Sequence, residues 1–209
     1  MPTLLHLDSS PLGEASISRN LSQHYVEAWK LLHPLSSVIT RDLTIASIPP
    51  VTAGWVGASY TPEDARTSEQ KELLRLSDAL IAELQSADEY VLGVPMHNFG
   101  IPSTLKLWID QIARAGKTFA YVNGEPKGLL KGKKATFLIA SGGVYDAGTA
   151  MASLNFVDPY LRTIFGFLGV VDTTFISAGG AAALNYGKID RQSFLQPHID
   201  SIQRHLQPA

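Results

Sequence analysis

The sequence has no cysteine, no long hydrophobic run and no excess of either charge. Without cysteine the chain can form no disulfide, thiolate metal site or cysteine nucleophile, so any redox chemistry must belong to a bound cofactor. No stretch approaches the roughly eighteen apolar residues of a membrane span, and the first residues lack the basic segment of a signal peptide, so we expect a cytoplasmic protein without a membrane partner. The 17 basic and 19 acidic residues give a net charge of −2, which predicts a small-molecule partner and no nucleic acid.

Several catalytic motifs are also missing. The chain has no G-x-S-x-G, no Walker lysine motif and no G-x-G-x-x-G, which argues against the usual hydrolases, nucleoside triphosphatases and dinucleotide-binding enzymes. Its six histidines show no paired metal-ligand spacing, so we expect no metal site.

Short apolar runs alternate with longer segments of helical period along the whole chain, which predicts a parallel sheet with helices on both faces. The expected strands lie at residues 4–7, 38–39, 90–94, 135–140 and 170–176. The expected helices run over about 16–33, 73–84, 105–112, 157–168 and 191–206. Because no linker divides the sequence, we expect one α/β domain over residues 1–209, a doubly wound five-stranded sheet of order 2-1-3-4-5.

A serine-rich loop follows the first predicted strand. Ser10, Ser16 and Ser18 could hold a phosphate together with the exposed amides and the positive end of the following helix. The alternative is that Ser16 is a helix N-cap and the other serines are ordinary loop residues.

The loop after the third predicted strand combines polar and aromatic groups. The strand breaks at Pro95, and the chain re-enters a helix at Ser103 and Thr104, where we expect a side-chain cap. Backbone amides and Asn98 could pair with the edge of a flat polar ring such as isoalloxazine, with Met96 and Phe99 as apolar contacts. The alternative is a tight turn in which Met96 and Phe99 belong to the core.

A third loop, residues 140–145, follows the fourth strand. The paired Gly142 and Gly143 allow positive φ and a close backbone approach to a ring, although a plain glycine turn is the alternative. The three loops follow strands one, three and four, which are neighbours in the predicted order, so they meet at one edge of the sheet. Aromatic residues outside the regular elements could wall a substrate pocket there, with Phe119, Tyr121 and Tyr145 as candidates.

These loops resemble those of the bacterial FMN-dependent NADH:quinone reductases and azoreductases of the flavodoxin-like fold. The similarity covers nearly the whole chain, and two of its motifs are specific in combination, Pro95-Met96-His97-Asn98-Phe99 and Arg114-Ala115-Gly116-Lys117-Thr118-Phe119. The resemblance implies a homodimer with both active sites at the subunit interface. It also implies FMN phosphate contacts at Ser10, Ser16, Ile17 and Ser18, ring contacts at Met96, His97, Asn98 and Phe99, and further contacts at Ala140, Ser141, Gly142 and Gly143.

The sequence departs from this family at two places. His97 stands where many relatives carry tyrosine, and Ala140-Ser141 is less polar and less basic than the version typical of the family. Both departures concern the surroundings of the flavin ring, so they leave the substrate preference open.

We therefore predict a two-electron reductase that works by ping-pong, taking hydride from NADH or NADPH and passing it to a quinone or an azo compound. The flavin carries the chemistry, and no side chain is needed as a catalytic residue, although His97 or Tyr121 could supply a proton. One alternative is a flavodoxin-type electron carrier, against which the near-balanced charge argues. Another is a binding module without turnover, or a flavin-free hydrolase with Ser10 as nucleophile.

Overall fold

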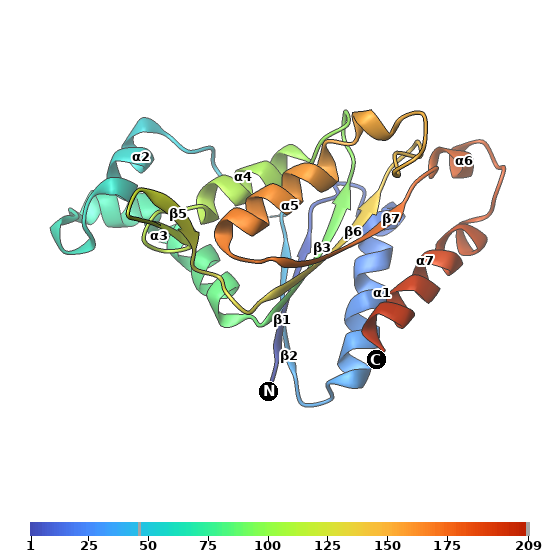
Figure 1. Ribbon diagram of the computed structural model, residues 1–209, viewed down its shortest axis with the longest axis horizontal. Helices are drawn as coiled ribbons and strands as arrows, with labels where there is room; N and C mark the ends of the chain where they lie inside the picture. Colours follow the sequence, from blue (N-terminus) through green and yellow to red (C-terminus); the bar gives the residue numbers. More distant parts are fainter. Residues whose placement is uncertain (46, 208–209) are drawn as a thin grey trace.

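A five-stranded parallel sheet forms the centre of the molecule (Figure 1). The computed structural model describes residues 1–45 and 47–207. The sheet order is β2 (Ser37–Asp42), β1 (Thr3–Asp8), β3 (Glu89–Pro95), β6 (Lys134–Ala140) and β7 (Asp172–Ala178), and every neighbouring pair is parallel. This confirms the expected order 2-1-3-4-5 of main-sheet strands. Among the described residues, no helix is both long enough and apolar enough to cross a membrane.

Helices cover both faces of the sheet. Helices α3 (Ser68–Ser86), α4 (Ser103–Ile112) and α5 (Val157–Leu168) pack on one face, and α1 (Ile17–Leu32) and α7 (Arg191–Leu206) pack on the other. Side chains along a strand alternate between the two faces of the sheet, so neighbouring residues belong to different cores. In β1, Leu5 belongs to the core on the first face and Leu4 to the core on the second.

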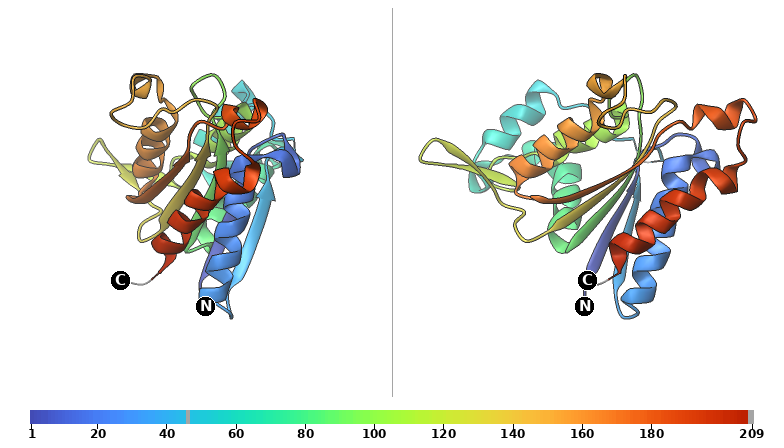
Figure 2. Two further views of the ribbon diagram at one scale, coloured as in Figure 1. Left: turned by 90° about the vertical axis from the view of Figure 1, so that its right-hand side faces the viewer. Right: turned by 45° about the vertical axis from the view of Figure 1, so that its right-hand side comes forward.

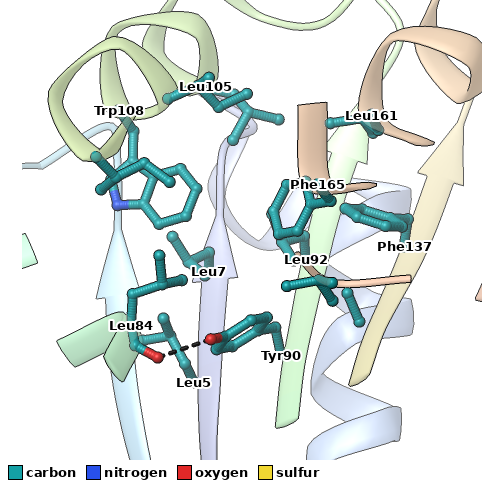
Figure 3. Close-up of a cluster of buried hydrophobic side chains, with 14 of the residues drawn as sticks. Leu5, Leu7, Leu84, Tyr90, Leu92, Leu105, Trp108, Phe137, Leu161 and Phe165 are labelled. Atoms are coloured by element: carbon teal, nitrogen blue, oxygen red, sulfur yellow. Dashed lines mark hydrogen bonds between the residues drawn. The ribbon is translucent and has the colours of Figure 1, made fainter. Parts of the chain in front are cut away.

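The larger core lies beneath α4 and α5 (Figure 3). Trp108 of α4 and Phe165 of α5 are at most 1% exposed and point down onto strand residues such as Leu7. The Tyr90 hydroxyl, a polar group within this cluster, donates to the Leu84 carbonyl at 2.7 Å. Burial on this scale stabilises the sheet by about 1.5–3 kcal/mol for each large side chain.

The structure adds elements that the sequence pattern did not predict. They are α2 (Ala53–Tyr60), an antiparallel hairpin of β4 (Phe119–Val122) and β5 (Glu125–Gly128), α6 (Ala182–Asn185), and the 3-10 helices η1 (Gly13–Ala15), η2 (Glu63–Ala65) and η3 (Ala152–Leu154). Two predicted strands have wrong limits. The second is longer than residues 38–39, and the fifth begins at Asp172, because Gly169 ends α5 at φ 104° and Val170 still belongs to that turn.

The hairpin and α6 lie at opposite ends of the molecule (Figures 1 and 2). The hairpin is anchored at Gly128, whose position is so close to α5 that a Cβ there would lie 2.2 Å from the Gly169 nitrogen. Only glycine fits such an approach of one backbone to another. The hairpin is therefore held at its base while its tip projects from the body of the protein.

Candidate cofactor-binding site

The loop after β1 forms the first wall of the site. Ser10, Ser16 and Ser18 are all at most 2% exposed, although hydroxyls of this kind usually face solvent. The Ser16 hydroxyl accepts the Arg19 amide as the N-cap of α1 and lies 3.2 Å from the Ser18 hydroxyl. The cap alternative is therefore correct for Ser16, but it leaves the first amides of α1, those of Ile17 and Ser18, without intrahelical acceptors.

A partly buried network of charged groups supports this loop. The Nε–H of Arg19 donates to the Ser10 carbonyl at 2.8 Å. Its Nη1 and Nη2 donate to the two carboxylate oxygens of Asp42, at 2.6 and 2.7 Å. Burial alone would raise the pKa of Asp42, but hydrogen bonds from Arg19 and Thr44 lower that pKa to about 2. The network keeps Asp42 ionised and fixes the backbone of the loop at Ser10.

Asp8 continues the network towards the core. Its carboxylate accepts the Ser22 hydroxyl at 2.8 Å, and the His6 ring nitrogen lies 3.0 Å from the same hydroxyl. Gly93 of β3 stands directly against these groups, since a Cβ there would lie 2.6 Å from the Asp8 oxygen. The first turn of α1 thus rests on a closely packed polar layer.

The loop after β3 is a tight turn in an unusual conformation. The amide of His97 donates to the Gly100 carbonyl at 2.9 Å, and the reverse bond measures 3.0 Å. Between them Asn98 and Phe99 have φ of 49° and 70°, values that non-glycine residues seldom adopt and that cost of order 1–3 kcal/mol each. The turn holds three exposed side chains, those of His97, Asn98 and Phe99, at the end of β3.

The helix after this turn begins differently from the prediction. The N-cap of α4 is Pro102, and no side chain caps it, so the expected cap at Ser103 or Thr104 is wrong. Instead the Thr104 hydroxyl donates to the Ser9 carbonyl at 3.4 Å. This bond ties the loop after β1 to the segment after β3.

The loop after β6 completes the rim. Gly142 and Gly143 do not adopt positive φ, so that part of the prediction is wrong, and a close backbone approach to a cofactor ring stays a prediction. A Cβ on Gly143 would lie 3.1 Å from the ring of Tyr145. The Ser141 hydroxyl donates to the Gly143 carbonyl at 2.9 Å, which fixes the turn.

The three loops enclose one cavity of about 500 Å³ at the carboxyl ends of β1, β3 and β6. This volume is within the usual range for cofactor sites. The predicted residues that line the cavity are Ser10, Ser16, Ile17, Met96, His97, Ala140, Ser141 and Gly142. Their convergence is the main geometric feature of the site.

Other predicted site residues lie beside the cavity or away from it. Ser18, Asn98, Phe99 and Gly143 belong to the same loops but do not line it. Tyr145 lies close by and meets Phe99 edge to face, with ring centroids 6.1 Å apart.

A single chain does not bring Phe119 and Tyr121 to this cavity, because both lie on the β4 strand of the hairpin. Phe119 packs on Phe167 with ring centroids 4.7 Å apart, and Tyr121 is 65% exposed. Their role as pocket walls stays a prediction.

The sequence pattern missed one wall of the cavity. Residues of α6 and of the turn before it, Ala181, Ala182, Leu184 and Asn185, line it, as does Arg191 at the start of α7. The amides of Ala181 and Ala182 donate to the Ser141 and Gly142 carbonyls, which joins this segment to the loop after β6. A four-residue helix gives no periodicity to detect, although the Asp190 side chain that caps α7 marks where Arg191 begins the next helix.

The site has two chemically different ends. One end offers buried hydroxyls and the amides of the first turn of α1, donors that suit a phosphate. The other end offers Pro95, Met96 and backbone groups of the loops after β3 and β6, which suit a flat ring. These residues fit FMN, whose phosphate and ring differ in the same way.

Comparisons with known proteins agree with this geometry. A family model described as flavodoxin-like fold matches residues 2–206. The FMN-dependent NADH:quinone oxidoreductase of Acidobacterium capsulatum is 56% identical over 203 residues, which cover 97% of this chain and 98% of the relative. FMN-dependent NADH:quinone oxidoreductase 3 of Burkholderia lata is 49% identical over 200 residues, 96% of this chain and 97% of the relative.

Solved structures share the fold. An azoreductase from Bacillus anthracis has a TM-score of 0.87 at 24% identity and covers 98% of each chain, a likeness that shows the fold alone. An FMN-dependent NADH-azoreductase from the same species, solved in complex with FMN, has a TM-score of 0.86 at 26% identity and covers 98% of this chain and 97% of that one. The chain therefore belongs to the family of FMN-dependent NADH:quinone oxidoreductases within the flavodoxin-like fold.

Proposed function

We propose that this protein is an enzyme that binds FMN in the cavity at the ends of β1, β3 and β6 and reduces quinones and azo compounds with electrons from NADH. The observation that carries the proposal is the convergence of three loops, far apart in sequence, on one cavity with a phosphate-binding end and a ring-binding end. Bound FMN would supply two-electron redox chemistry, which this cysteine-free chain cannot supply from its side chains.

The phosphate end would act by fixed donors. Ser10 and Ser16 face the cavity with their positions already set, Ser10 by Arg19 and Ser16 by its own capping bond. Because these groups are held before the ligand arrives, little conformational entropy is lost when a phosphate binds. The amides of Ile17 and Ser18 add the positive end of the α1 dipole.

The ring end would orient the cofactor and leave one face open to substrates. The strained turn at Asn98 and Phe99 stands beside the cavity at the end of β3, and a ring that extends to this turn would meet backbone amides and the Asn98 side chain, which would stabilise negative charge along its edge. The His97 side chain lines the cavity and is exposed, so it can deliver a proton from solvent to a bound acceptor. NADH and the acceptor would use the same open face in turn, which is the basis of a ping-pong sequence.

A homodimer would cover an apolar surface beside the site. Ile101, Phe156, Pro159 and Tyr160 line a groove between the start of α4 and the start of α5, and Phe156 is 59% exposed. The Phe156 amide donates to the Phe99 carbonyl, so this groove borders the turn after β3 that stands beside the cavity. A second copy seated on the groove would lie at the active site and could bring the exposed Tyr121 of its hairpin to the partner's acceptor.

The proposal is tested with purified protein. We expect flavin absorbance in the protein as purified or after FMN is added, loss of that absorbance when NADH is added without oxygen, and its return with menadione. Parallel double-reciprocal plots at several menadione concentrations would support the ping-pong order. Protein that never acquires flavin absorbance would contradict FMN binding, and a flavin that NADH does not bleach would favour the electron carrier.

The homodimer has its own test. Light scattering during gel filtration should give twice the mass of one chain, and Phe156→Glu should shift the protein to the monomer. Tyr121→Ala should keep the dimer and raise the KM for the acceptor. A wild-type monomer with full turnover would contradict this arrangement.

A further inference from the structure

Arg191, the first residue of α7, is joined to the loop that leads into α1. Its Nη1 donates to the Ala15 carbonyl at 3.0 Å, and its Nη2 donates to the Glu14 and Ser16 carbonyls at 3.1 and 3.2 Å. These carbonyls lie directly before the amides at the phosphate end of the cavity. One guanidinium therefore connects an element near the end of the chain to the loop after β1.

The charge of Arg191 is not neutralised in the way that the charge of Arg19 is. Arg19 contacts two carboxylates, those of Asp42 and Asp8. In the part of the chain that the structure describes, Arg191 donates to carbonyl oxygens and forms no ion pair. Among the described residues that line the cavity, it is the one with a full positive charge at neutral pH.

The position of Arg191 is unfavourable for α7 itself. A cation in the first turn of a helix lies at the positive end of the helix dipole, where anions are preferred and cations are disfavoured. The side chain turns away from α7 and lies across the carbonyls of the neighbouring loop. The stability of α7 therefore does not explain why an arginine stands here.

An anion in the cavity would explain why an arginine stands at position 191. A phosphate monoester carries a charge of about −1.5 to −2 at pH 7, whereas the end of a helix supplies only about half a positive charge. The other donors at this end, Ser10 and Ser16, are neutral. Arg191 lines the same cavity, donates to the Ser16 carbonyl, and supplies the full positive charge that these donors lack.

We propose that Arg191 is the electrostatic partner of the FMN phosphate and clamps the loop before α1 in its binding conformation. This inference rests on the proposed function, because it presupposes FMN in the cavity. It predicts selectivity for the phosphorylated flavin: removal of the charge should weaken FMN binding and leave the binding of riboflavin, which has the ring but no phosphate, nearly unchanged.

The test is a titration of the apoprotein with FMN and with riboflavin, followed by quenching of flavin fluorescence. In Arg191→Gln we expect the Kd for FMN to rise about tenfold, equivalent to about 1.4 kcal/mol, while the Kd for riboflavin stays within about twofold. Arg204→Gln is the matched control, since it removes the same charge from an exposed position at the other end of α7. It should leave both dissociation constants unchanged.

Each other outcome has a distinct meaning. An unchanged FMN affinity in Arg191→Gln would overturn the inference. Equal losses of affinity for FMN and for riboflavin would overturn the electrostatic pairing with the phosphate and leave Arg191 only the role of holding the loop before α1. Should the glutamine variant fail to fold, Arg191→Lys keeps the charge without the planar fork, and it should still prefer FMN over riboflavin. Wild-type apoprotein that binds neither flavin would refute the proposed function, and with it this inference.

Discussion

Gly93→Ala is the substitution whose effect the structure defines most closely. A Cβ at this position would lie 2.6 Å from the Asp8 carboxylate oxygen and 3.0 Å from both the Ser18 carbonyl and the Ser22 hydroxyl. All three groups belong to the polar layer beneath the first turn of α1, where Ser22 donates to Asp8 at 2.8 Å. The added methyl group must therefore displace Asp8 and lengthen that hydrogen bond.

The cost follows from two contributions. Overpacking a tight interior costs about 1–3 kcal/mol, and a lost hydrogen bond to a buried carboxylate adds about 1.5–3 kcal/mol. With partial relaxation we expect Gly93→Ala to lower the free energy of unfolding by about 3 kcal/mol, which in a chain of this size lowers Tm by roughly 6–12 °C. FMN affinity should fall as well, because the Ser18 backbone is part of the phosphate end.

Circular dichroism during heating, with and without FMN, measures both effects. Gly57→Ala is the control: Gly57 lies in α2 with nothing within 4 Å of its Cβ position, so alanine there should stabilise the protein by up to about 1 kcal/mol through helix propensity. A Gly93→Ala protein with the Tm and the FMN affinity of the wild type would refute the packing argument.

Three further predictions follow from the contacts described above. Because hydrogen bonds from Arg19 hold the folded-state pKa of Asp42 at about 2, below its unfolded value, the wild type should lose about 2 kcal/mol more stability than Asp42→Asn as the pH falls from about 4 to 2. Urea titrations across this range should show the two curves converging, and parallel curves would contradict the assignment. Gly128→Ala, which forces a Cβ against the Gly169 backbone, should lower the free energy of unfolding by about 3 kcal/mol and expose the hairpin to protease; an uncleaved hairpin at wild-type stability would oppose this. His97→Phe should lower menadione turnover and flatten its pH profile, whereas full turnover at every pH would exclude His97 as the proton donor.

Much of the fold could be predicted from periodicity because most of the main strands and helices, β3 and α1 among them, bury apolar residues at regular spacing. Helix α1 illustrates this: its predicted limits of 16–33 differ from Ile17–Leu32 only by the two cap residues, Ser16 and His33. The convergence of three loops also followed from the strand order alone. Parallel strands place their carboxyl ends at one edge, whatever the loops contain.

The missed elements depend on contacts that are remote in sequence. Strand β5 reads Glu-Pro-Lys-Gly, with no apolar alternation, and it forms because β4 pairs with it and Gly128 fits against α5. Positive φ at Phe99 had no signal in the sequence, and the signal at Asn98 was weak, since asparagine tolerates the left-handed region but glycine is the usual residue there. Arg191 was missed because its partners are backbone carbonyls, which no side-chain pattern reveals.

A crystal structure of the protein with FMN tests the central claim most directly. The account predicts the phosphate within hydrogen-bonding distance of Ser10, Ser16 and the first amides of α1, and the ring between the loops after β3 and β6. Flavin density outside the cavity, or with its phosphate away from α1, would contradict the account.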